Sequence, residues 1–132
     1  MIGVDTNVLV RLLIEEDATQ TALAVQFFDA RSSRDPAFIS LVVVAELAWV
    51  LGKTYKFSHD QVKTVMLGLL EAPDVVVERD EIVRSALAQF DHVKIDLADL
   101  LIAATGRQAG APATVTFDRN AAKRISGMEL LA

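Results

Sequence analysis

Residues 1–7 of the chain read Met1-Ile2-Gly3-Val4-Asp5-Thr6-Asn7, and the rest of the sequence is best understood from this stretch. A short apolar run stops at an aspartate, and a Thr-Asn pair leads into new apolar residues. We predict a buried strand over residues 2–5 that presents Asp5 at its carboxyl end, then a helix capped by Thr6. Ligands bind at this edge of open α/β sheets. Asp5 is therefore the first candidate for an acidic metal site.

Composition limits the class of protein. The chain has 132 residues, of which 52% are hydrophobic and 23% charged, so we expect one folded domain rather than a disordered chain. It has no cysteine, which excludes disulfides, thiolate zinc sites and cysteine nucleophiles. We see no signal peptide and no apolar run of about eighteen residues, so we expect a cytoplasmic protein. The net charge of −5 argues against a nucleic-acid binder.

Strands and helices alternate along the chain. Beyond the opening stretch, we expect strands at residues 37–39, 75–77, 114–117 and 128–131. Helices are expected from just after Thr6 to residue 13, at residues 18–30, 41–55 and 59–71, from just after Asp80 to residue 90, and at residues 97–109 and 120–125. The predicted N-caps include Ser40, Asp80 and Asp96, and Ser58 and Gln61 are expected to form a capping box. This order predicts the α/β class, as a single-domain α/β/α sandwich with a central, mainly parallel sheet of four to five strands.

Four acids stand out from the other carboxylates, which lie in polar turns or on helix faces. Asp5 and Asp118 each end an apolar strand, whereas Glu46 and Asp99 are the only charges in their apolar helical segments. A helix that is apolar all round is buried, and a carboxylate in it needs a partner or a metal ion. Neither Glu46 nor Asp99 has a lysine or arginine three or four residues away. The order of the elements brings all four acids to one edge of the predicted sheet.

Each of these acids also has a simpler explanation. Asp5 and Asp118 could cap the helices that follow them. Glu46 could pair with a distant arginine. Asp99 could be the third-position acid of a capping box begun by Asp96, which we assign to capping itself.

The chemistry of the four acids together indicates a hard metal ion. Converging carboxylates repel one another unless a cation lies between them. A set of oxygen ligands favours Mg²⁺ or Mn²⁺ over zinc, and His59 and His92 are expected to be exposed rather than ligands. Such an ion polarises a phosphoryl oxygen and activates water, so the residues alone suggest metal-dependent phosphodiester hydrolysis.

The sequence resembles a known family at four places. These are the stretches Val4-Asp5-Thr6-Asn7-Val8-Leu9, Ala45-Glu46-Leu47-Ala48-Trp49-Val50-Leu51, Ala98-Asp99-Leu100-Leu101-Ile102-Ala103-Ala104 and Thr116-Phe117-Asp118. In this order they are similar to the signatures of PIN-domain proteins, above all the VapC-type toxins of toxin–antitoxin pairs. The resemblance implies that residues 1–132 form one PIN-like nuclease domain. It further implies a homodimeric endoribonuclease that depends on Mg²⁺ or Mn²⁺, acts on RNA and is inhibited by a cognate antitoxin protein.

The resemblance also implies roles for single residues. Asp5, Glu46, Asp99 and Asp118 would form an acidic quartet, with Asp5 and Asp99 as direct metal ligands and the other two acting through water. Supporting roles would fall to Thr6 and Thr116, as hydroxyl residues beside the first and last acids, and to Asn7 and Asn120, which would orient carboxylates or water.

Two other functions remain open at this point. One is a flavodoxin-like phosphotransfer domain with Asp5 as nucleophile, although no second acid follows two residues later. The other is a non-toxin or degenerate PIN module that acts in RNA processing or protein binding. The net charge does not exclude a nucleic-acid substrate, because without the four acids it would be −1. RNA phosphates could then meet the basic residues Arg11, Lys53, Lys56, Arg119, Lys123 and Arg124.

Overall fold

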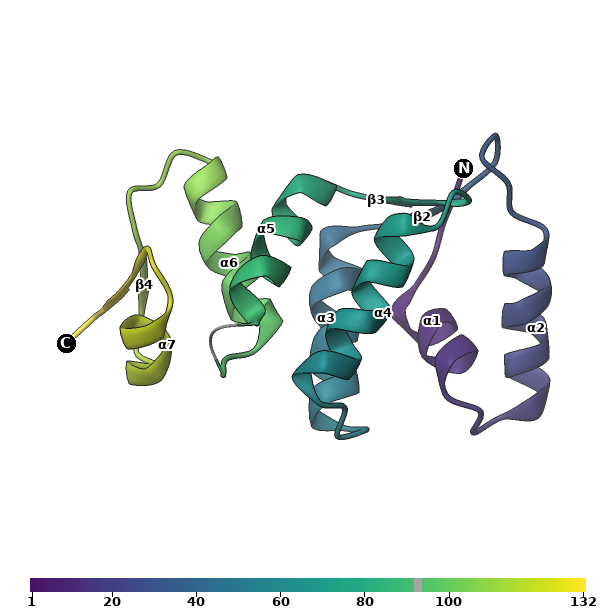
Figure 1. The fold of residues 1–132 in the computed structure, drawn as a ribbon, viewed down its shortest axis with the longest axis horizontal. Coiled ribbons are helices and arrows are strands. Elements are labelled where there is room, and N and C mark those ends of the chain that lie inside the picture. Colours follow the sequence, from purple (N-terminus) through teal and green to yellow (C-terminus); the bar gives the residue numbers. More distant parts are fainter. Residues whose placement is uncertain (92–93) are drawn as a thin grey trace. The chain divides into compact units, whose positions relative to one another are not determined.

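The computed structural model describes residues 1–91 and 94–132, which form two compact units, Met1–Arg79 and Asp80–Ala132. Figure 1 shows the order of the elements along the chain. We describe each unit by itself. The expectation for His92 lies outside the described residues.

The first unit contains a three-stranded parallel sheet and four helices. Its elements are β1 (Ile2–Gly3), α1 (Thr6–Leu13), α2 (Ala18–Asp29), β2 (Ala37–Ile39), α3 (Leu41–Lys53), α4 (His59–Glu71) and β3 (Val75–Val77). The strand order is β1-β2-β3, with Ile2 opposite Ala37 and Phe38 opposite Val76. Because both pairings are parallel, the carboxyl ends of the three strands lie at one edge of the sheet.

The second unit pairs two strands beside three helices. Its elements are α5 (Asp80–Phe90), α6 (Leu97–Gln108), β4 (Thr114–Thr116), α7 (Arg119–Arg124) and β5 (Met128–Leu130). Strands β4 and β5 are also parallel, with Thr114 opposite Met128. The predicted α/β class with parallel strands is confirmed. Asp80 is the first residue of α5, not the residue that caps it.

The strands are less buried than the sequence predicted. Strand β2 lies in the centre of its sheet, and Ala37 and Ile39 are fully buried. Strand β1 ends at Gly3 and is an outer strand, and its Ile2 is 44% exposed. Val4, the first residue after β1, is buried. In the two-stranded sheet Val115 is 59% exposed. An unbroken apolar run therefore did not identify a fully buried strand. An outer strand pairs with one other strand only, so its free edge and the side chains along it stay more open to solvent.

Helices α3 and α6 are not buried all round, which corrects a prediction. On α3, Val44, Leu47 and Leu51 are buried, while Val42 is 75% and Trp49 is 53% exposed. On α6, Ile102 is 52% exposed. Each helix thus has one buried face, and apolar side chains continue onto the other face.

The N-terminal strand is fixed beside β2 by hydrogen bonds around Asp35. The Met1 ammonium donates to Asp35 Oδ1 at 2.7 Å, and Arg31 Nη1 donates to Oδ2 at 2.8 Å. The hydrogen bond from the ammonium is the main reason why the pKa of Asp35 lies below its usual value. The Val4 amide also donates to the Phe38 carbonyl at 3.0 Å, which continues the pairing towards Asp5.

Helix starts follow the predicted capping chemistry at two places. Ser40 Oγ accepts from the Val43 amide at 3.2 Å. The Ser58 capping box is confirmed: Ser58 Oγ accepts from the Gln61 amide at 3.1 Å, and Gln61 Oε1 accepts from the Ser58 amide at 2.8 Å. Among the helices of residues 1–91 and 94–132, none has the length and apolarity needed to cross a membrane.

The capping box gives a test of this part of the fold. Replacing Ser58 with alanine removes the acceptor for the Gln61 amide, so we expect the free energy of unfolding to fall by about 1 kcal/mol. Urea denaturation measures this value. The matched control Ser33→Ala, at an exposed loop position, should change it by less than about 0.5 kcal/mol. Equal effects of the two substitutions would contradict the assignment.

Candidate acidic site

Asp5 and Glu46 are brought together by the parallel pairing of β1 and β2. Each strand leads into a helix at the same edge of the sheet, with Asp5 at the start of α1 and Glu46 in the second turn of α3. Both side chains line one pocket of about 290 Å³. Its lining residues are Asp5, Thr6, Asn7, Val10, Arg11, Glu46, Val50 and Tyr55.

Asp5, and not Thr6, is the N-cap of α1. Asp5 has extended backbone angles, and its Oδ1 atom accepts from the Thr6 amide at 2.8 Å. The predicted cap was one residue late because the helix already includes Thr6. The second carboxylate oxygen of Asp5 has no hydrogen-bond partner in the described part of the chain. Asp5 can therefore cap the helix and still offer one oxygen to a ligand in the pocket.

Glu46 is exposed, so burial is not the reason why it would need a counter-charge. The predicted burial of Glu46 is wrong: its sequence neighbours are apolar, but the face of α3 that carries it is open to solvent. Within residues 1–91 and 94–132, Glu46 makes no hydrogen bond or ion pair, so the suggested pairing with a distant arginine is not formed there. Both of its carboxylate oxygens remain available to a ligand.

The hydroxyl of Thr6 is buried without a partner. Thr6 is 4% exposed, and its Oγ1 atom is the one buried side-chain oxygen or nitrogen in the described residues that makes no hydrogen bond. Asn7 is exposed beside it. The unpaired hydroxyl of Thr6 therefore lowers the free energy of unfolding. Thr6 lines the same pocket as two of the predicted acids, Asp5 and Glu46.

Asp99 lies in the first turn of α6 and is half-buried. Asp96 occupies the N-cap position, as predicted, but its side chain makes no capping hydrogen bond. The Asp99 amide instead donates to the backbone carbonyl of Asp96 at 3.1 Å. The capping box that could have explained Asp99 is therefore not formed.

Asp118 does act as the cap of α7, which was one of the two explanations left open. Its Oδ1 atom accepts from the Ala121 amide at 3.0 Å, and its own amide donates to Thr116 Oγ1 at 3.0 Å. Asn120 Oδ1 accepts from Arg124 Nε at 2.8 Å. The Asp118 side chain is exposed.

Asp5 and Glu46 suit a hard cation. Taking each unit alone, no three His, Asp or Glu side chains in residues 1–91 and 94–132 lie close enough to hold a metal ion. Asp5 and Glu46 nevertheless line one pocket and supply only oxygen. Mg²⁺ is commonly bound through one or two carboxylates and several waters, so these two residues fit such an ion.

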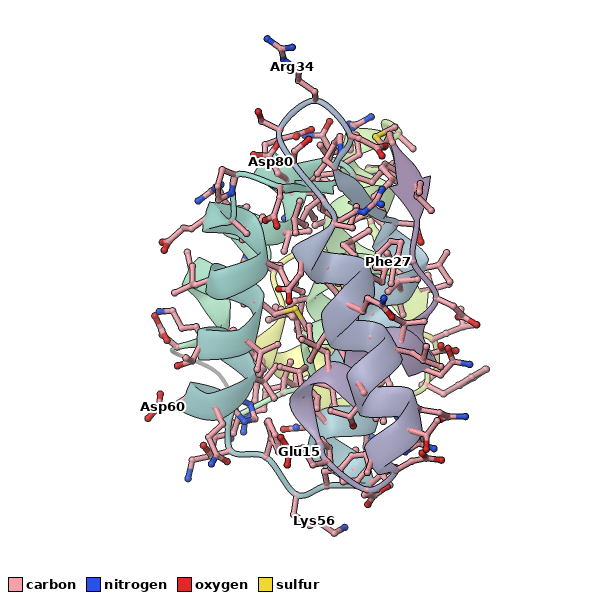
Figure 2. The ribbon with its side chains drawn as sticks, turned by 90° about the vertical axis from the view of Figure 1, so that its right-hand side faces the viewer. Glu15, Phe27, Arg34, Lys56, Asp60 and Asp80 are labelled. Carbon is pink, nitrogen blue, oxygen red and sulfur yellow. The ribbon has the colours of Figure 1, made fainter. Side chains whose placement is uncertain are left out.

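Sequence reasoning missed the polar cluster at the other end of this pocket. Arg11 Nε donates to Gln20 Oε1 at 2.6 Å, and Arg11 Nη1 lies 3.4 Å from Glu16 Oε2. The Tyr55 hydroxyl donates to the same oxygen of Glu16 at 2.9 Å. Residues 16 and 55 are far apart in the sequence, so no local spacing could have predicted this contact. Figure 2 shows the end of the first unit where Glu15 and Lys56, the neighbours of Glu16 and Tyr55, lie opposite Arg34.

One family model matches nearly the whole chain. The family model described as PIN domain matches residues 2–127. The chain belongs to the PIN-domain family. PIN domains are generally metal-dependent nucleases that act on nucleic acid. No curated protein matches the chain.

The unpartnered hydroxyl of Thr6 gives a test of the geometry in this PIN domain. Thr6→Val removes a buried group without a hydrogen bond and keeps the branched shape, so we expect the free energy of unfolding to rise by about 1 kcal/mol. Urea denaturation in EDTA measures it, with the exposed Thr19→Val as control. A loss of about 1 kcal/mol in Thr6→Val would show that the hydroxyl has a partner in solution.

Tyr55 allows the polar cluster of the PIN domain to be tested directly, because it is the only tyrosine. The hydrogen bond to Glu16, with burial and the negative charge of Glu16 as smaller causes, raises the pKa of Tyr55 above its ordinary value of 10.0. Ultraviolet absorbance of the tyrosinate should therefore titrate above pH 10.0. Glu16→Ala should lower the midpoint, and Glu15→Ala should not. The same midpoint in all three proteins would contradict the contact.

Proposed function

We propose that residues 1–132 act as one PIN nuclease domain, a Mg²⁺- or Mn²⁺-dependent endoribonuclease that is the toxin of a toxin–antitoxin pair in the cytoplasm. Asp5, Glu46, Asp99 and Asp118 would together hold the metal ion. The observation that carries this proposal is the shared pocket of Asp5 and Glu46, in which Glu46 makes no pair. Further support comes from the family match, which includes all four acids.

The side chains of the pocket have separate tasks in this proposal. The free oxygen of Asp5 and the carboxylate of Glu46 bind the cation, while the other oxygen of Asp5 keeps the start of α1 in place. A divalent ion bound there would lower the pKa of a water molecule and polarise a phosphoryl oxygen. Asn7 is exposed at the same pocket, and its amide can donate to a phosphate oxygen.

The second unit would contribute Asp99 as a direct ligand and Asp118 through water. Asp118 already caps α7 through Oδ1, so its other oxygen would face the water. Thr116 supports this arrangement because its hydroxyl accepts from the Asp118 amide and fixes the turn. These roles follow from the resemblance and from the local contacts of each residue.

Protein partners form part of the same proposal. A cognate antitoxin would inhibit the nuclease, and two copies of the chain would form a homodimer. The exposed apolar side chains Val42 and Trp49, on the same face of α3 as Glu46, support a protein contact close to the acidic site.

Cleavage of RNA by the purified chain tests the proposed function. With Mn²⁺ we expect endonucleolytic cleavage that stops in EDTA and falls about 10²- to 10⁴-fold in Asp5→Asn and in Asp99→Asn. Gel analysis of a labelled RNA measures the rate.

The control for this experiment is Asp29→Asn, which changes an exposed aspartate at the end of α2 and should leave the rate unchanged. Cleavage that survives EDTA and both site substitutions would overturn the proposed function. Absence of cleavage in every protein would favour a degenerate PIN module instead.

A further inference from the structure

The pocket of Asp5 and Glu46 has an acidic end and a basic end. Helices α1 and α3 both start at the carboxyl edge of the parallel sheet, and residues from both helices and from the segment after α3 line this pocket. Asp5 and Glu46 lie near the starts of these helices, whereas Arg11 lies in the last turn of α1 and Tyr55 follows the end of α3. Arg11 is six positions after Asp5, which is about 9 Å along the helix axis.

Arg11 is oriented by its neighbours and not by the acids of the pocket. Gln20 accepts from Nε at 2.6 Å, and Glu16 accepts from Nη1 at 3.4 Å. In the described residues, no ion pair joins Arg11 to Asp5 or Glu46. The Thr21 hydroxyl also donates to the Arg11 carbonyl at 2.8 Å, which fixes the backbone at the end of α1.

The guanidinium keeps most of its hydrogen-bonding capacity. Arginine has five N–H donors, and the contacts with Gln20 and Glu16 use two of them. The ion pair with Glu16 is long, and the side chains are 31% and 53% exposed, so it contributes little stability and can be replaced. A phosphate, like a carboxylate, matches the planar donors of arginine and can accept two parallel hydrogen bonds from them.

We propose that Arg11 binds a backbone phosphate of single-stranded RNA next to the phosphate that is cut, and that Glu16 occupies this position until RNA binds. This inference rests on the proposed function, which places the reacting phosphate at Asp5 and Glu46. The pocket volume of about 290 Å³ suits a short part of one strand and not a duplex. Gln20 would hold the guanidinium in the same orientation in both states.

Substitutions of Arg11 and Glu16 should have opposite effects on RNA binding. Binding of a labelled single-stranded oligoribonucleotide is measured by fluorescence anisotropy at several salt concentrations, in EDTA so that metal-dependent cleavage does not interfere. We expect Arg11→Gln to weaken binding about tenfold and to reduce the slope of log K against log salt by about one. Glu16→Gln removes the competing charge, so its binding should be equal to or tighter than that of the wild type.

The matched control is Arg34→Gln, which removes an arginine at the opposite end of the first unit (Figure 2). It should change binding less than twofold and leave the salt slope unchanged. If Arg11→Gln does not fold, Arg11→Lys keeps the charge but loses the planar donors, and it should still bind more weakly than the wild type.

Two results would overturn this inference. One is wild-type binding no tighter than that of the Arg11 variant, and the other is equal weakening by Arg11→Gln and Glu16→Gln, which is the behaviour of a purely structural contact. Cleavage is not the readout, so the two proposals can fail separately. Arg11-dependent binding without nuclease activity would overturn the proposed function and leave Arg11 as a phosphate-binding residue, and cleavage with Arg11-independent binding would overturn only this inference.

Discussion

The parallel pairing of β1 with β2 is the constraint on which the first half of the site depends. Opposite residues such as Ile2 and Ala37 fix the register, and each strand then leads into a helix at the same edge. The starts of α1 and α3 must therefore lie close together, and Asp5 and Glu46 line one pocket. A shift of the register by one residue would turn the side chains of β1 to the other face of the sheet.

Helix capping and ligand binding are compatible at the same carboxylate. Asp5 and Asp118 each use one oxygen to accept an amide hydrogen at a helix start. A carboxylate has a second oxygen, which the capping hydrogen bond leaves free to bind a ligand. The two explanations left open by the sequence are therefore not exclusive, because a cap also fixes the direction in which the other oxygen points.

The sequence predicted the α/β class, the parallel pairing and most helix bounds, because these follow from apolar periodicity and capping residues. The Ser58 capping box is an example in which side-chain chemistry alone located a helix start. The sequence did not predict that Val42 and Trp49 would be exposed. An apolar segment does not reveal which face of a helix packs against another element. Glu46 is therefore not buried as predicted, although it lines the same pocket as Asp5.

The sequence could not predict the cluster of Arg11, Glu16 and Tyr55 either. Its members come from α1, the turn after it and the loop after α3, and only the packing of these helices brings them together. Contacts of this kind depend on tertiary structure, and no spacing rule along the chain describes them. The family resemblance also did not identify them, because the motifs that carry it centre on the four acids.

Direct titration of the chain with Mn²⁺ by isothermal titration calorimetry tests the central claim, that Asp5 and Glu46 together form part of a cation site. The account predicts that the wild type binds Mn²⁺, that Asp5→Asn and Glu46→Gln each bind it much more weakly, and that Asp29→Asn binds it as the wild type does. Equal Mn²⁺ affinity in all four proteins, or no binding by the wild type, would contradict it.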